Sequence, residues 1–314
     1  MTMMIMISAM YENGGNTTHR MLDGHPELFV YPFESQVGTG LVNDYLASFV
    51  PIRYRWPEFP LEGTPEQDYE LFWDEELKTY LRVRSRSKFR DCGLEMDEGD
   101  RRREFVEYVR GKPRSRPTIV SAFFHSTFAA WRNLARSGKE RAWVGYNPVQ
   151  VLDVAKFFAD FPDGHMIHVV RHPYAGFADT KKRPFPLSLE RYAWTWNLCQ
   201  HMALVAQEQF AGRFHLLRFE DLVKDTEAAM RPLLKALGLA WSDRCTTPTF
   251  NAAPLGQVAP WGTIRTPTTD ANLATRNELS KDEQARMSTL TRVMFDLVYG
   301  REAARTELQG ALRA

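Results

Sequence analysis

The sequence is poor in cysteine. It has three, Cys92, Cys199 and Cys245, and none of them belongs to a CxxC pair. So small and odd a set argues against a disulfide framework and against a cysteine-ligated zinc site. We therefore expect a protein of a reducing compartment, most simply the cytoplasm, with no bound metal.

A strong charge imbalance and long apolar runs are also lacking. The formal net charge is +1, which does not fit the strongly basic surfaces that bind nucleic acid or anionic membranes. No stretch is long enough to cross a bilayer. The apolar start, residues 1–10, has no basic flank and no small-residue cleavage site, so we interpret it as a buried strand rather than a targeting signal. The expected partner is a small molecule held by a local site.

Strand-like and helix-like segments alternate along most of the chain. This alternation predicts an α/β fold, a P-loop-type parallel sheet flanked by helices, formed by the 314 residues as a single domain. Ligands of such sheets bind at the carboxyl ends of the strands. We expect strands at residues 5–10, 28–31, 143–146, 166–170 and 214–219, and helices at 17–22, 121–136, 187–210, 226–237, after Pro148 and after Ser280, which forms a capping box with Glu283.

Two segments interrupt this alternation. Residues 51–117 are rich in Arg, Glu and Asp with aromatic residues between them, which predicts an insertion of charged amphipathic helices. The insertion is either a solvated helical face with core aromatics or a lid over the substrate, where its aromatics would suit an apolar or ring-bearing molecule. Residues 240–279 are rich in Pro, Thr and Gly, and predict a long functional loop.

The first predicted strand leads into a glycine-containing turn and then a helix. Successive backbone N–H groups of such a turn, with the helix N-terminus and neighbouring hydroxyls, form an anion cradle. An ordinary strand-to-helix turn is the alternative. No Lys lies in the segment 12–18 (ENGGNTT), so it is not a Walker A loop, and a conventional kinase is disfavoured. The predicted anion-binding residues are Asn13, Gly14, Gly15, Asn16, Thr17 and Thr18.

Four blocks in a fixed order resemble the family of sulfotransferases that use 3'-phosphoadenosine 5'-phosphosulfate (PAPS). The family commonly shows RSGTT followed by LLDSHPEL, a strand ending in VR[DN]P, the motif R[YF]EDLV, and a closing helix. The resemblance covers most of residues 3–50 and 118–300, and it is closer to the carbohydrate and tyrosylprotein type than to the small-phenol type. The similar blocks here are 12–28 (ENGGNTTHRMLDGHPEL), 168–173 (HVVRHP), 217–223 (LRFEDLV) and 279–300.

The resemblance implies PAPS as donor and no metal requirement. The donor's 5'-phosphate would lie on residues 13–18. Its 3'-phosphate would meet Arg171 and the residue eight or nine positions later, Asp179 or Thr180. Arg265, in the late loop, is a further candidate for the 3'-phosphate.

Two positions depart from the family's pattern. Glu12 stands where the family has a cation, and Asp179 stands where it has a serine. Both carboxylates would repel a phosphate. A cation from elsewhere is therefore expected, with Arg20, Lys181 and Lys182 as candidates, and Thr180 would replace the serine.

Sulfuryl transfer needs positioning, charge stabilisation and a base for the acceptor hydroxyl. Glu34 is the first candidate base, because the family has a glutamate at about this distance after the HP motif, and His125 is the second. Either side chain could instead be structural. His19 would face the donor or lie exposed on its helix.

Three functions fit the sequence. The preferred one is a sulfotransferase acting on a hydroxyl of a small natural product or sugar. The alternatives are a nucleotide enzyme with another donor, such as an unusual kinase, and a non-catalytic nucleotide-binding member of the fold.

Overall fold

A parallel sheet of five strands forms the centre of the molecule. The computed structural model describes residues 2–256 and 275–300, so Arg265 lies outside the described residues. The strand order is β2-β3-β1-β4-β5, and every neighbouring pair is parallel. This confirms the predicted α/β fold. The strands are β1 (Met3–Ala9), β2 (Leu28–Val30), β3 (Ala142–Tyr146), β4 (His165–Val170) and β5 (Phe214–Arg218).

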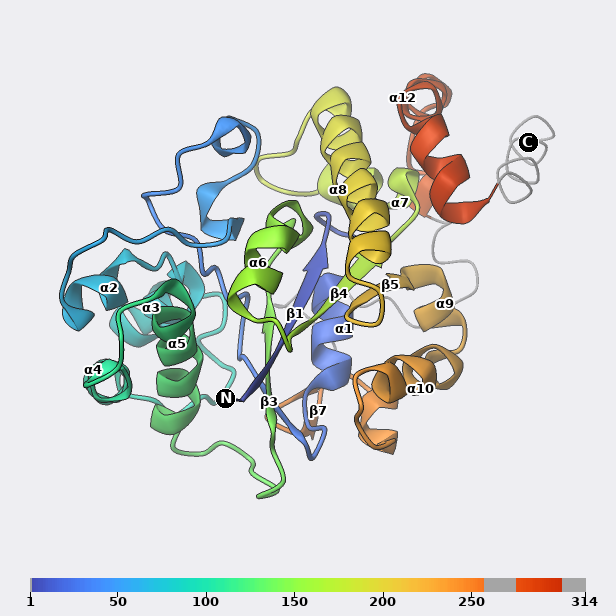
Figure 1. Ribbon diagram of the computed structural model, residues 1–314. Helices are drawn as coiled ribbons and strands as arrows, with labels where there is room; N and C mark the ends of the chain where they lie inside the picture. Colours follow the sequence, from blue (N-terminus) through green and yellow to red (C-terminus); the bar gives the residue numbers. More distant parts are fainter. Residues whose placement is uncertain (1, 257–274, 301–314) are drawn as a thin grey trace.

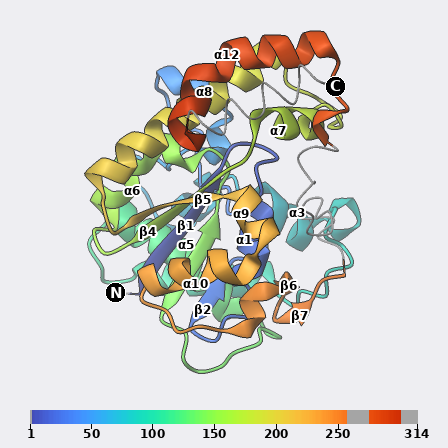
Figure 2. The same cartoon turned by 90° about the vertical axis from the view of Figure 1, so that its right-hand side faces the viewer.

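Helices cover both faces of the sheet, and the side chains of β1 alternate between the two (Figures 1 and 2). Met4 and Met6 belong to the core under α5 (Arg116–Ala130), α6 (Val154–Asp160) and α8 (Leu189–Gln209). Ile5 and Ile7 belong to the core under α1 (Gly15–Leu22) and α10 (Thr226–Ala236). A strand buried on both faces explains the continuous apolar run.

Three predicted boundaries were wrong for local reasons. The helix expected at 121–136 begins at Arg116, since Ser115 caps it with Pro117 in its first turn, and it ends at Ala130. Val149, with a φ of 55°, delays the helix expected after Pro148, so a 3-10 turn, η4 (Gln150–Asp153), precedes α6. Phe219 begins a helix, α9 (Phe219–Lys224), instead of ending β5.

Helix α7 (Pro173–Thr180) was not predicted either. It starts directly after β4 with Pro173 in its first turn and His172 as the cap. The last helix, α12 (Lys281–Tyr299), has the predicted capping box of Ser280 and Glu283, and it packs against α8 (Figure 2). Among the described residues, no helix is long and apolar enough to cross a membrane.

The insertion between β2 and β3 forms a helical cap beside the sheet (Figure 1). Its helices are α2 (Pro65–Leu71), α3 (Glu75–Arg82) and α4 (Glu98–Val109), and α4 packs on α5. Most of its aromatic side chains are buried in the core, which agrees with a solvated helical face with core aromatics. The buried ones are Tyr54, Trp56, Tyr69, Phe72, Tyr80, Phe89 and Phe105.

Candidate active site

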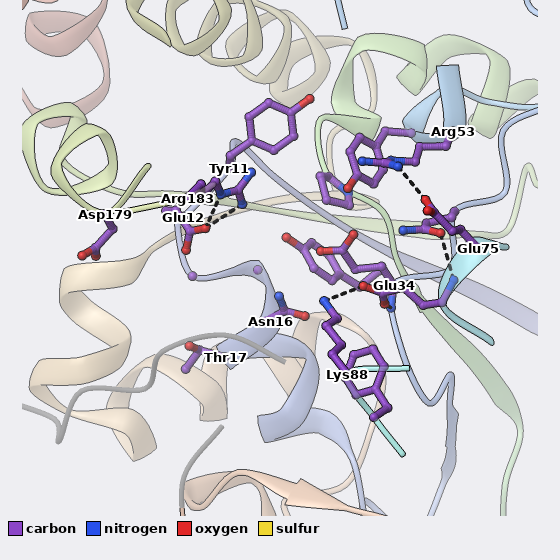
Figure 3. A pocket seen from close by; sticks show the side chains of 18 of the residues that line it. Tyr11, Glu12, Asn16, Thr17, Glu34, Arg53, Glu75, Lys88, Asp179 and Arg183 are labelled. Carbon is purple, nitrogen blue, oxygen red and sulfur yellow. Dashed lines mark hydrogen bonds and ion pairs between the residues drawn. The ribbon is translucent and has the colours of Figure 1, made fainter. Parts of the chain in front are cut away.

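A cavity of about 570 Å³ lies at the carboxyl edge of the sheet, where the loops after the strands meet the cap. Figure 3 shows charged side chains converging on it from both sides. One wall belongs to the sheet and its loops, and the other belongs to residues 53–89. The sheet wall comprises Tyr11, Glu12, Gly14, Gly15, Asn16, Thr17, Glu34, Gln36, Tyr146, Pro148, Arg171, Asp179, Arg183 and Phe219.

Close packing explains the two glycines of the loop after β1. Gly14 has a φ of 90°, and a Cβ there would overlap the Phe219 ring. A Cβ on Gly15 would overlap the Tyr146 ring. Only glycine allows the backbone to pass between these rings, which leaves the start of α1 open to the cavity.

The polar side chains of this loop divide into two groups. Asn13 is fully buried, accepts from the backbone N–H of Arg171 at 3.1 Å and donates to the Tyr192 hydroxyl at 2.9 Å. The Thr18 hydroxyl donates to the Gly14 carbonyl at 3.1 Å. These two side chains hold the loop in shape. The other two predicted residues, Asn16 and Thr17, line the cavity, and the buried Asn16 Oδ1 has no hydrogen-bond partner among the described residues.

Arg171 follows β4 and lies on the cavity wall with a side chain only 7% exposed. Its Nη1 donates to the backbone carbonyl of Glu12 and to Asp179 Oδ2, both at 2.9 Å. The guanidinium lies over the Phe219 ring, 5.0 Å from its centre. Arg171 thereby joins the loop after β1 to α7 and α9.

Cations neutralise both carboxylates that depart from the family's pattern. Arg183 contacts Glu12 Oε1 through Nε at 2.7 Å and Nη2 at 2.6 Å, and Asp179 contacts Arg171 and Lys182. Burial lowers the pKa of Arg183, but Glu12, together with Tyr54 and Glu34, raises it, so the pKa lies above its ordinary value.

The cations predicted from sequence lie elsewhere. Arg20 is fully buried and donates to the Tyr31 carbonyl at 2.8 Å. Lys181 pairs with Glu283 at 2.6 Å. Neither lines the cavity. Lys182 does not line it either, but pairs with Asp179, which does.

Glu34 lies on the cavity wall after β2, next to a second carboxylate from the cap. Its backbone N–H donates to Glu76 Oε2 at 3.0 Å, and Glu76 Oε1 pairs with Lys88 Nζ at 2.6 Å. Burial and the nearby charge of Glu34 raise the pKa of Glu76 to about 7. A second ion pair, Arg53 with Glu75 at 2.6 Å, lies on the same side (Figure 3).

Three predicted residues are not brought to the cavity. His125 lies on α5, beside Tyr108, with the two rings tilted by 37° and their centres 4.7 Å apart. Thr180 is buried, and its hydroxyl donates to the Gly176 carbonyl at 2.9 Å. His19 is fully buried against Arg20, so it neither lies exposed nor faces the cavity, and burial lowers its pKa.

Sequence reasoning missed the cavity residues of the cap and Arg183. The segments 74–76 (DEE) and 86–88 (RSK) are charged, but the whole insertion is charged, so composition did not single them out. Only packing shows that they face the sheet. In the described part of the chain, no group of three or more His, Cys, Asp or Glu side chains is arranged to hold a metal ion.

A family model described as the sulfotransferase family matches residues 5–243. The chain belongs to this family. It is therefore a transferase enzyme, as the sequence predicted. No curated protein sequence matches the chain.

Solved structures of sulfotransferases resemble the fold at low sequence identity. A sulfotransferase domain from the curacin biosynthetic pathway is 16% identical, with a TM-score of 0.55 over 92% of this chain and 97% of that one. The domain from the Synechococcus PCC 7002 olefin synthase is 16% identical, with a TM-score of 0.48 over 92% and 94%. Sulfotransferase STF9 from Mycobacterium avium is 12% identical, with a TM-score of 0.45 over 95% and 77%. The first of these supports the sulfotransferase fold.

Proposed function

We propose that this enzyme transfers the sulfuryl group of PAPS to a hydroxyl of a small molecule. One observation carries the proposal: a single cavity is lined by the loop after β1, by Arg171 after β4 and by Glu34 after β2. An anion cradle, a phosphate-binding cation and a carboxylate base are the three parts that in-line transfer from a nucleotide donor requires. Family membership supplies the reaction class.

The donor would bind along the sheet side of the cavity. The backbone of residues 14–17 would take the 5'-phosphosulfate at the start of α1, where the N–H groups of a first helical turn favour an anion. Arg171 would take the 3'-phosphate. The orphaned Asn16 Oδ1 fits a bound molecule, because buried polar atoms normally have partners. The carboxylates of Glu12 and Asp179 permit an anion here because each is paired with arginine.

The reaction would be an in-line displacement at sulfur. The acceptor oxygen forms a bond to sulfur while the bond from sulfur to the 5'-phosphate oxygen breaks, and 3'-phosphoadenosine 5'-phosphate (PAP) leaves with the electron pair. The proton of the acceptor hydroxyl passes to the Glu34 carboxylate. Glu34 is preferred to His125 as the base because only Glu34 lines the cavity.

The acceptor would lie between Glu34 and the cap. The cap wall is mostly charged, with Phe89 and Tyr54 as its aromatic members, so a polar hydroxyl compound such as a sugar or a functionalised natural product suits it better than a purely apolar ring compound. A carboxylate base also agrees with the carbohydrate and tyrosylprotein type of the family.

Calorimetric titration with PAP, without metal, tests this function. We expect micromolar binding that Arg171→Ala weakens at least tenfold, with ADP and ATP weak. Arg141→Ala is a matched control, because Arg141 precedes β3 at the opposite edge of the sheet and should leave binding unchanged. Glu34→Gln should retain PAP binding and lose turnover with a responsive acceptor. Preference for ATP with magnesium, or no PAP binding, would overturn the proposal.

A further inference from the structure

The donor loop has no cation of its own. The segment 12–18 contains neither Lys nor Arg. The two arginines of the sheet wall are already paired. Arg171 contacts the Glu12 carbonyl and Asp179, and Arg183 contacts the Glu12 carboxylate. A sulfuryl group bound above this loop would therefore need a positive charge from another part of the cavity.

Lys88 of the cap lies across the cavity from this loop. Its side chain is 52% exposed and lines the cavity, and Nζ lies 4.8 Å from the centre of the Phe89 ring. In Figure 3 the side chain extends from the cap toward the middle of the cavity, between Glu34 and Asn16. Burial lowers the pKa of Lys88, but the charges of Glu76 and Glu34 raise it above its ordinary value, so the ammonium stays charged.

Glu76 fixes where this ammonium lies. Its side chain is 11% exposed, with one oxygen on Lys88 Nζ at 2.6 Å and the other on the Glu34 backbone N–H at 3.0 Å. Its own N–H donates to Gln36 Oε1 at 3.3 Å. Glu76 thus ties the first turn of α3 and Lys88 to the segment that carries Glu34. A carboxylate with this many partners holds a long flexible lysine in one place.

On the basis of the proposed function, we propose that the cap supplies the cation that the donor loop lacks: Lys88 binds the sulfuryl group of the donor, and Glu76 is the residue that positions it. The ammonium then meets the sulfuryl oxygens from the side of the acceptor. It adds a charge-assisted hydrogen bond where negative charge is spread over those oxygens during transfer.

The test compares two ligands that differ only in the sulfuryl group. Affinities for PAPS and for PAP are measured by calorimetry for the wild type, Lys88→Met, Lys88→Arg and Glu76→Gln. We expect Lys88→Met to weaken PAPS binding about tenfold or more, the size of one charge-assisted hydrogen bond, with PAP affinity within about twofold of the wild type. Lys88→Arg should recover part of the loss, and Glu76→Gln should give a smaller loss in the same direction.

Controls separate this inference from the proposed function. Lys139→Met removes an exposed lysine at the opposite edge of the sheet and should change neither affinity. Equal losses of PAPS and PAP binding, or unchanged PAPS binding in Lys88→Met, would overturn the role of Lys88. A wild-type protein that binds neither ligand would instead overturn the proposed function. If Lys88→Met fails to melt cooperatively, the comparison is made with Lys88→Gln.

Discussion

At the scale of single residues, two glycines without side chains shape the cavity as much as the polar residues that line it. Gly14 and Gly15 leave room for the rings of Phe219 and Tyr146, which come from different parts of the chain. The loop is therefore fixed by packing from both sides.

We expect Gly14→Ala to destabilise the protein by about 2–4 kcal/mol, since it adds both left-handed backbone strain and overlap with Phe219. Gly138→Ala is the control, because Gly138 has a similar φ of 79° but no atom near its Cβ position. It should cost only about 1 kcal/mol. Urea unfolding of both variants makes the comparison. Equal losses would contradict a role for the Phe219 contact.

A second residue-scale prediction concerns Glu76, whose pKa is raised from 4.5 to about 7. A carboxyl group with a raised pKa in the folded state stabilises that state fully at low pH, and the contribution is lost as the pH rises through about 7. Glu76→Gln should therefore be more stable than the wild type at pH 8, by about 1–3 kcal/mol, with the difference shrinking toward pH 5. Thermal melts across this range test the sign, and parallel curves for the two proteins would refute it.

At the scale of elements, the sequence predicted the sheet better than the cap. Each predicted strand lies within one or two residues of a real one, because a strand buried on both faces is a short apolar run between turn residues. The loop residues and Arg171 were found because they follow such strands directly. Lys88 and Glu76 were not, since their position depends on how the cap packs against Glu34, which no local pattern encodes.

A buried ion pair joins two parts of the cap, and Tyr31, just after β2, connects this pair to the sheet. Asp74, just before α3, pairs with Arg101 of α4, both fully buried, and accepts from the Tyr31 hydroxyl at 2.7 Å. Removing one member leaves an uncompensated buried charge.

We therefore expect Arg101→Ala to cost about 3–5 kcal/mol and to expose the cap to limited proteolysis. Arg103→Ala, on the same helix, removes an exposed pair with Asp100 and should cost under about 1 kcal/mol. Chemical unfolding and digestion with trypsin measure both effects. A cap that stays protected in Arg101→Ala would show that apolar packing alone holds it.

At the scale of the whole molecule, the cavity joins segments that are far apart in the chain. Its lining residues come from the segments 11–17, 34–36, 53–89, 146–148 and 171–183 and from Phe219. A ligand there bridges the cap and both halves of the sheet, so binding should stabilise the whole fold.

Saturating PAP, at about one hundred times its dissociation constant, should stabilise the wild type by about 2.7 kcal/mol. The same PAP concentration should stabilise Arg171→Ala far less. Differential scanning calorimetry with and without PAP makes this measurement. An equal rise in melting temperature for both proteins would place the ligand away from Arg171.

The cap wall of the cavity comes from one continuous stretch, residues 53–89, whereas the donor side is assembled from loops along the rest of the chain. Under the proposed function, one exchangeable segment of the chain would therefore determine which acceptor is used. Exchange of this stretch between related enzymes should transplant acceptor preference and leave the donor unchanged, provided that Glu76 and Lys88 are inherited together. New acceptors could then arise by recombination within a single gene segment, without rebuilding the chemistry beneath.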